Sequence, residues 1–228
     1  MTVQVLEKPV KIILEVSNAM GSETSKPPFQ LIAGHPTLDF VNTLDSRFET
    51  FGPVELLKSY DDLLRFIRQS ELLPPEQEKT LARLARQHPD DRILQSCIRL
   101  RETIADCLYS ALDGGAPKTA SLSELEKFYR STRSHQSPAW REGHLEWRWT
   151  ESKPGLELPL WILTLNAWSL LRSPLMKSVR ACGNPTCRWL FLDTSKNHTR
   201  RWCDMKICGN RMKGRRFRSQ QRSPANAD

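Results

Sequence analysis

Apolar residues recur at helical spacing through most of the chain before residue 176. The clearest case is residues 92–112, where the apolar positions keep a period of about 3.6 residues. Shorter helices are predicted at residues 63–72 and 76–87, and a further one ends near Arg133. Residues 159–171 are apolar on nearly every side, as in a helix that is largely buried. The fold is therefore predicted to be mainly α-helical.

Side chains that cap helices mark where several of these elements begin. Ser59 precedes one helix, with two acidic residues at the positive end of the helix dipole. Ser121 or Ser123 is the expected cap of a later helix, and Thr37 is the expected cap of a short early one. These signals support separate short helices between residues 37 and 133.

Residues 140–150 alternate apolar and polar side chains, which is the pattern of a small β-hairpin. Glu142 and Gly143 are expected to form its turn. One face carries three large side chains, Leu145, Trp147 and Trp149. The three tryptophans of this segment, Trp140, Trp147 and Trp149, either form an aromatic box for a ligand or pack as the core of a small sheet, and we expect the core packing.

Residues 1–30 contain two β-branched patches followed by Gly, Ser and Pro residues, which predicts a short strand or extended arm and then a linker. The composition, 39% hydrophobic and 26% charged, is ordinary for a soluble protein. No apolar run approaches the ~18 residues of a membrane span, and no cleavage pattern marks a signal peptide. We expect a cytoplasmic protein, in which paired cysteines bind metal rather than form disulfides.

The positive charge of the chain is concentrated at its C-terminal end. The whole sequence carries a formal net charge of +8, with 34 Lys and Arg residues against 26 Asp and Glu. From Met176 onward there are thirteen basic and three acidic residues, a net charge of +10, whereas the residues before it carry a net charge of −2. This asymmetry predicts a polyanionic partner for the tail, most often nucleic acid. A tail that only improves solubility is the other interpretation.

Four of the six cysteines lie in this basic segment. They form two close pairs with 15 residues between the pairs: Cys182, Cys187, Cys203 and Cys208. Such spacing is typical of a structural Zn²⁺ site, in which four thiolates complete a tetrahedron. His198 is the nearby substitute ligand, but it belongs to neither pair. Cys97 and Cys107 lie on or beside the apolar stripe of a helix, so we expect them in the core.

The residues between the cysteines predict a treble-clef-like zinc finger, which is a β-hairpin followed by a helix. Turn-forming residues separate Cys182 from Cys187, and the alternation after Trp189 suits a strand that returns toward the first one. Cys203 suits the start of a helix that continues to about Arg218. Roughly 40 residues bury too little surface to fold alone, and structural Zn²⁺ supplies on the order of 10–16 kcal/mol in such modules. Because four protein ligands leave no open position, we expect one structural Zn²⁺.

Basic residues surround and follow the last cysteine pair. Together with one asparagine they are the candidate nucleic-acid contacts: Arg200, Arg201, Asn210, Arg211, Lys213, Arg215, Arg216 and Arg218. A helix that carries them suits contact with phosphates or entry into a major groove. In the alternative interpretation, arginines balance the charge of the zinc thiolates; the candidates are Arg180, Arg188, Arg201 and Arg211.

Three polar residues at the predicted first helix form a candidate ligand pocket. Asp39 and Asn42 lie three residues apart, which puts both on one helix face, and His35 precedes them. The alternative is that they cap the helix or satisfy buried polar groups, and spacing alone favours this second interpretation.

The second cysteine pair ends in Cys208-Gly-Asn-Arg211, which with its surroundings resembles the CGNR zinc-finger family over about residues 177–220. The segment Leu38-Asp-Phe-Val-Asn-Thr43 is similar to the start of the ABATE domain of stress-induced transcription regulators. The resemblance implies a bacterial transcription regulator whose finger binds DNA and whose helical domain senses a ligand. It divides the chain into an arm or linker (1–30), an ABATE-like domain (31–175), a zinc finger (176–220) and a disordered tail (221–228).

We therefore predict a zinc-dependent, DNA-binding transcription regulator that is not an enzyme. One helical finger gives a short footprint, so specific binding is expected to require a homodimer. One rival is an RNA-binding protein in which Trp189, Trp202 or Phe217 stacks on unpaired bases. The other is a small-molecule binder or enzyme in the helical domain, with a purely structural finger.

Overall fold

The computed structural model describes residues 28–88, 91–150 and 155–222 of the chain. The strand or arm predicted in residues 1–30 falls outside these ranges apart from its last three residues. Residues 223–228 of the predicted tail also fall outside, while residues 221 and 222 belong to the last helix. No helix of the described ranges is long and apolar enough to cross a membrane.

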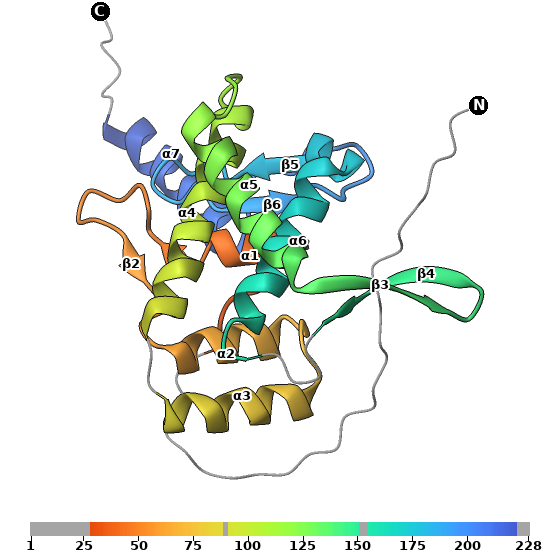
Figure 1. The fold of residues 1–228 in the computed structure, drawn as a ribbon. Helices are drawn as coiled ribbons and strands as arrows, with labels where there is room; N and C mark the ends of the chain where they lie inside the picture. The colour runs from red at the N-terminus through yellow and green to blue at the C-terminus, as the bar shows by residue number, and fades with distance from the viewer. Residues whose placement is uncertain (1–27, 89–90, 151–154, 223–228) are drawn as a thin grey trace, which may run out of the picture.

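The core forms where five helices of the N-terminal region meet. These are α1 (Pro36–Val41), α2 (Tyr60–Gln69), α4 (Asp91–Leu112), α5 (Thr119–Ser134) and α6 (Leu158–Arg172). The short helix α1 packs against both α4 and α6, near the centre of the molecule (Figure 1). Its apolar side chains are fully buried, and so is most of the stripe along α4. The helical period along α4 therefore marks the side that faces α1, α5 and α6.

Three further elements of the N-terminal region lie between α1 and α4 in the chain. Helix α3 (Pro75–Gln87) packs on α2, to which it is joined by an ion pair between Arg68 and Glu78. Strands β1 (Leu44–Asp45) and β2 (Val54–Glu55) pair antiparallel after α1. Their two-residue length gives too little alternation to be predicted from sequence.

The predicted caps are confirmed at one helix and wrong at two. The Ser59 hydroxyl accepts a hydrogen bond from Asp62 N, as expected for the start of α2. At α1 the cap is His35, whose Nδ1 accepts from Thr37 N at 3.1 Å, and Thr37 lies inside the helix. At α5 the helix begins after Lys118, and the Ser121 hydroxyl donates to Asp106 Oδ2 at 2.7 Å instead of capping. A tertiary bond to α4 thus replaces the local one.

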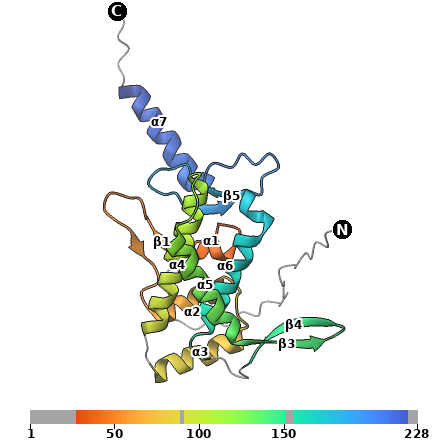
Figure 2. The ribbon, with the colours of Figure 1, turned by 45° about the horizontal axis from the view of Figure 1, so that its top comes forward.

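The predicted hairpin forms from β3 (Gln136–Arg141) and β4 (His144–Trp149). Glu142 and Gly143 make its turn with φ of 49° and 82°, the left-handed backbone that a two-residue hairpin requires. The predicted core packing is wrong for Trp140, Leu145 and Trp147, which are 72%, 60% and 51% exposed. The hairpin extends beyond the helices, which leaves most of its apolar face uncovered by the described residues (Figures 1 and 2). Trp149 packs against the body as predicted and stacks on Trp161, and the Arg133 guanidinium of α5 lies 3.5 Å from the centre of the Trp147 ring.

The C-terminal segment forms the predicted β-hairpin plus helix. Strands β5 (Val179–Ala181) and β6 (Leu190–Leu192) pair antiparallel with Arg180 opposite Phe191. A π-helix (Met205–Gly209) leads directly into α7 (Asn210–Arg222). All three side chains of β6 are buried, and β6 contacts α1. The hairpin of the finger is therefore part of the same core as the N-terminal helices.

Candidate metal centre and nucleic-acid interface

The first cysteine pair stands at the two ends of a tight loop between β5 and β6. Cys182 N donates to Trp189 O at 2.8 Å, and Cys187 N donates to Asn184 O at 3.0 Å, so backbone bonds close the loop. The fully buried Asn184 directs its amide nitrogen at Cys208 Sγ, 3.8 Å away. A donor of this kind orients and stabilises a thiolate ligand, and it ties the first loop to the second pair.

The second cysteine pair flanks the start of the π-helix. The Asp204 side chain accepts from Ile207 N at 2.8 Å, and Asp204 O accepts from Cys208 N at 3.0 Å. Gly209 follows in a crowded position, where an added Cβ would lie 2.4 Å from the Met205 sulfur. An alanine here would require the Met205 side chain to move and would crowd the Trp202 ring, 3.2 Å away.

The four cysteine sulfurs converge on one point. All of them lie within 4.8 Å of one another, and two of the separations are 3.7 Å: Cys187 to Cys203, and Cys203 to Cys208. A tetrahedron with metal–sulfur bonds of about 2.3 Å has sulfur–sulfur edges of about 3.8 Å. The donor set and its spacing therefore fit one Zn²⁺. Three of the four cysteines are buried and Cys187 is half-buried.

The crowded sulfurs need a cation. Hydrogen bonds from the neighbouring thiols hold the pKa of Cys182 well below its usual value. The same contact raises the pKa of Cys187, since a second bare thiolate would face the first. A divalent ion that bonds to all four sulfurs removes this repulsion.

His198 and two of the arginines lie away from the cysteine cluster. His198 Nδ1 is 3.1 Å from Asp193 O, so its ring is engaged in the loop before the second pair. Arg188 forms an ion pair with Asp113 at 2.6 Å, and Arg180 donates to backbone carbonyls. Arg211 is different, because it lines a cleft together with three of the cysteines.

Hydrogen bonds that involve side chains join the finger hairpin to the N-terminal region. Asn42 Nδ2 donates to Leu190 O and Leu190 N donates to Asn42 Oδ1, both at 2.9 Å and both buried. Trp189 Nε1 donates to Asp45 Oδ1 at 2.9 Å. The backbone adds a further bond, from Leu192 N to Ala33 O at 2.8 Å. The side-chain amide of Asn42 thus makes the pair of hydrogen bonds to Leu190 that a neighbouring strand would make.

The residues of the candidate ligand pocket have structural partners. His35 caps α1, and Asn42 holds β6 as described. Asp39 is 7% exposed and its Oδ1 accepts from Ala33 N at 3.0 Å. Burial raises the pKa of Asp39 to about 6, although backbone bonds oppose the shift. The structure brings these residues together around the start of α1, where all three satisfy backbone groups.

Helix α7 is the most positively charged element of the structure. It projects away from the rest of the molecule, as Figure 2 shows. Five of its cations are exposed, and none is paired with an acidic side chain of the described residues: Arg211, Lys213, Arg215, Arg216 and Arg218. Arg201 is also exposed, over the ring of Trp202.

Arg200 is positioned differently from the other predicted nucleic-acid contacts. Its guanidinium donates to Trp202 O and Cys203 O and lies over the Phe191 ring. Arg200 N is also bound to the buried carboxylate of Asp193, at 3.0 Å. This arginine holds the loop between the cysteine pairs to β6.

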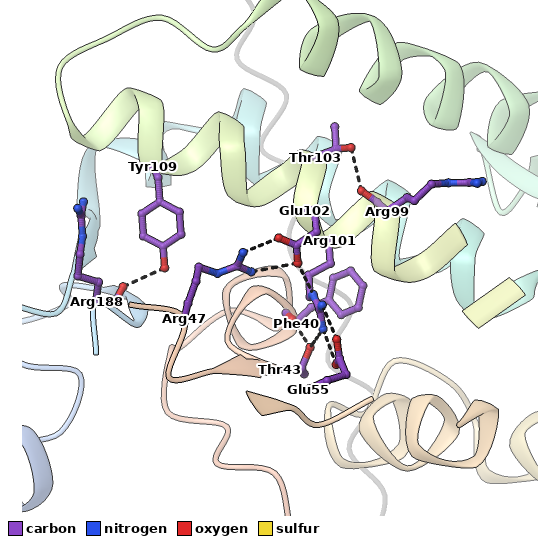
Figure 3. Close-up of polar contacts among 10 residues, drawn as sticks. All are labelled: Phe40, Thr43, Arg47, Glu55, Arg99, Arg101, Glu102, Thr103, Tyr109 and Arg188. Carbon is purple, nitrogen blue, oxygen red and sulfur yellow. Dashed lines mark hydrogen bonds and ion pairs between the residues drawn. The ribbon is translucent and has the colours of Figure 1, made fainter. Parts of the chain in front are cut away.

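A charge network around the buried Arg101 was not expected from the sequence (Figure 3). Arg101 on α4 is 1% exposed and binds both oxygens of Glu55 at 2.6 and 2.7 Å, Glu102 at 2.9 Å and the Thr43 hydroxyl. Burial opposes its charge, but the carboxylates outweigh this effect and raise the pKa of Arg101. Arg47 also binds Glu102. The sequence did contain one signal for this network, because Arg101 is a charged residue on the apolar stripe of α4, four residues after Cys97.

A cleft of about 620 Å³ lies where the N-terminal region meets the finger. Phe29, Lys58 and Arg65 line it from the N-terminal side. Trp189 and Arg211 line it from the finger. A molecule in this cleft would touch both parts of the chain.

Comparison with known protein families finds two matches. Residues 34–174 match the ABATE family, described as "Putative stress-induced transcription regulator". Residues 178–221 match the CGNR zinc finger. No curated protein matches the chain.

Proposed function

The chain belongs to the ABATE family of transcription regulators and carries a CGNR zinc finger, and we propose that it acts by binding duplex DNA through this finger. The observation that carries the proposal is helix α7. It begins two residues after the fourth cysteine, projects from the body and bears five exposed cations that have no acidic partner among the described residues.

One Zn²⁺ held by the four cysteines is the cofactor we propose. The sulfur spacing supports this assignment, and a full set of protein ligands makes the ion structural. Cys208 lies in the turn that opens α7, so the ion fixes where this helix starts and how it leaves the finger. The basic helix is then presented to a partner in one orientation.

The cations of α7 account for affinity through phosphate contacts. Each neutralised phosphate releases counterions, and the logarithm of the affinity falls with the logarithm of salt concentration by about 0.9 per contact. Five such contacts give a slope of about −4.5. Affinity for duplex DNA should therefore depend steeply on salt.

A charge-matched pair of variants tests the proposal. The triple variant Arg215→Ala, Arg216→Ala, Arg218→Ala removes three cations from α7. The control removes three exposed arginines elsewhere: Arg83→Ala, Arg86→Ala, Arg130→Ala. At 0.1 M salt the first variant should lose on the order of 10²–10³-fold in duplex affinity, and the control much less. Equal losses, or no duplex binding by the zinc-loaded protein, would contradict the proposal.

Single-stranded RNA is the main alternative partner. The aromatic side chains that would stack on bases are mostly inaccessible, because Trp189 is bound to Asp45 and Trp202 is half-buried. Phe217 is 60% exposed, and one ring is a small stacking platform. The low accessibility of these rings favours duplex DNA over single-stranded RNA. Displacement of bound duplex by a lower concentration of single-stranded RNA would reverse this assignment.

Ligand sensing by the helical domain is a second element of the proposal. The cleft next to Lys58 and Arg211 is a better candidate site than His35, Asp39 and Asn42, because those three already bind backbone groups. A thermal-shift screen should find a compound that stabilises the wild type but not Lys58→Ala. A response that Asp39→Ala abolishes while Lys58→Ala retains it would instead favour the first pocket.

Specific recognition by one short helix requires a second copy, so we propose a homodimer on DNA. Light scattering coupled to size exclusion measures this directly. A strict monomer both with and without DNA would contradict it.

A further inference from the structure

Helix α7 carries a pattern around its axis that positive charge alone does not explain. With about 100° between successive residues, nine of its thirteen residues form a first band with a flank on each side, while Met212 and Ser219 lie on the opposite face. The first band, spaced four, three and four residues apart, is uncharged: Asn210, Gly214, Phe217 and Gln221. One flank of this band is Arg211, Arg215 and Arg218, and the other flank is Lys213 and Arg216.

The uncharged band is open to a partner. Asn210 and Gln221 are exposed, and Phe217 is 60% exposed. The band lies on a helix that projects from the molecule, and its flanking cations have no acidic partner within the described residues (Figure 2). The structure therefore leaves both the uncharged band and its flanks available along the same helix.

Cations on both flanks fit a helix inside the major groove of DNA. There, a phosphate backbone runs along each side of the helix and base edges lie beneath it. A helix resting on the outside of one strand would need cations on one face alone. The minor groove, about 6 Å wide, is too narrow for a helix, and the major groove of duplex RNA is too narrow for side chains to read.

Resting on the proposed function, we infer that α7 lies in the major groove and reads A·T base pairs through Asn210, Phe217 and Gln221. The amide side chains of Asn and Gln pair with N6 and N7 of adenine, and an apolar ring contacts the methyl group of thymine. Seven residues of helix span about 10.5 Å, or about 3 base pairs, and four span about 6 Å, or about 2 base pairs. The expected site has three A·T positions at these two spacings.

Gly214 provides independent support. Glycine inside a helix costs about 0.5–1 kcal/mol relative to alanine, so a reason for it is expected. Nothing within the described chain supplies one, because an added Cβ would meet only the end of the Arg218 side chain, at 3.4 Å. Close approach of the helix backbone to the groove floor does explain glycine at this position. The base pair beneath Gly214 should then show no sequence preference.

Selection from a random duplex library with the zinc-loaded full-length protein tests the inference. The wild type should enrich A·T pairs at the three predicted positions. Asn210→Ala and Gln221→Ala should each lose the preference at one position and leave the salt slope unchanged. Arg216→Ala should keep every preference and reduce the salt slope by about 0.9. Gly214→Leu should raise the helix content measured by circular dichroism, yet bind duplex DNA at least tenfold more weakly.

The outcomes separate this inference from the proposed function. Steep salt dependence without any sequence preference would overturn the reading of A·T pairs and leave DNA binding intact. So would preferences that survive in both amide variants. Wild-type affinity in Gly214→Leu would overturn the close approach in the groove. Absence of duplex binding by the zinc-loaded wild type would overturn the proposed function as well.

Discussion

Replacing Asn42 with alanine tests whether the finger hairpin is held by the N-terminal helices. The substitution removes two buried hydrogen bonds of 2.9 Å and leaves the N–H and the C=O of Leu190 without their partner. Each unsatisfied buried group costs about 1–3 kcal/mol, so the free energy of unfolding should fall by roughly 2–6 kcal/mol. For a chain of this size the midpoint of thermal unfolding should drop by about 2–4 °C per kcal/mol.

The assay is urea unfolding followed by circular dichroism, together with hydrogen exchange of the β6 amides. Asn166→Ala is the matched control, because among the described residues the Asn166 amide bonds to Ile162 O within its own helix. We expect this control to cost about 0.5 kcal/mol and to leave exchange at Leu190 and Leu192 unchanged. If Asn42→Ala costs no more than the control, the reasoning that β6 depends on this amide is wrong. A lost ligand response at unchanged stability would instead support the pocket interpretation of Asn42.

Three other predictions concern separate parts of the structure. Arg101→Met should lower the free energy of unfolding in urea by about 3–5 kcal/mol, because it leaves the surrounding carboxylates without their cation. Adding Glu55→Leu should recover part of that loss. The raised pKa of Asp39 stabilises the fold below about pH 4, and that contribution is lost as pH rises through about 6. The free energy of unfolding of Asp39→Asn should therefore rise by roughly 2–3 kcal/mol relative to that of the wild type between pH 4 and pH 7. A difference between the two proteins that stays constant over this range would contradict the raised pKa. Trp140→Ala should change stability by less than about 0.5 kcal/mol, whereas Trp161→Ala, at a buried site, should cost about 3–5 kcal/mol.

Helix periodicity and cysteine spacing were the parts of the structure that the sequence predicted well. The apolar stripe of residues 92–112 placed α4 to within one residue, since a long amphipathic helix repeats its signal over many turns. The four cysteines meet as their spacing indicated, because short loops confine each pair. Local chemistry and local pattern were sufficient in both cases.

Features that depend on distant contacts were missed. Alternation showed which residues of the β3–β4 hairpin share a face, but not that the face would lie beyond the helices. Charge alone suggested Arg200 as a partner contact, although carbonyl groups of the folded loop hold its guanidinium. Asn42 is 148 residues from Leu190 in sequence, so no spacing argument could have joined them.

Zinc dependence of duplex DNA affinity tests the central claim most directly. The measurement pairs metal analysis of the purified full-length protein with titration of one duplex before chelation, after chelation and after return of Zn²⁺, with Cys107→Ala as a control outside the cluster and Cys203→Ser within it. We expect one zinc per chain, loss of DNA binding on chelation, recovery with Zn²⁺, and loss in Cys203→Ser but not in Cys107→Ala. Duplex affinity that is unchanged after the zinc has been removed would contradict the account.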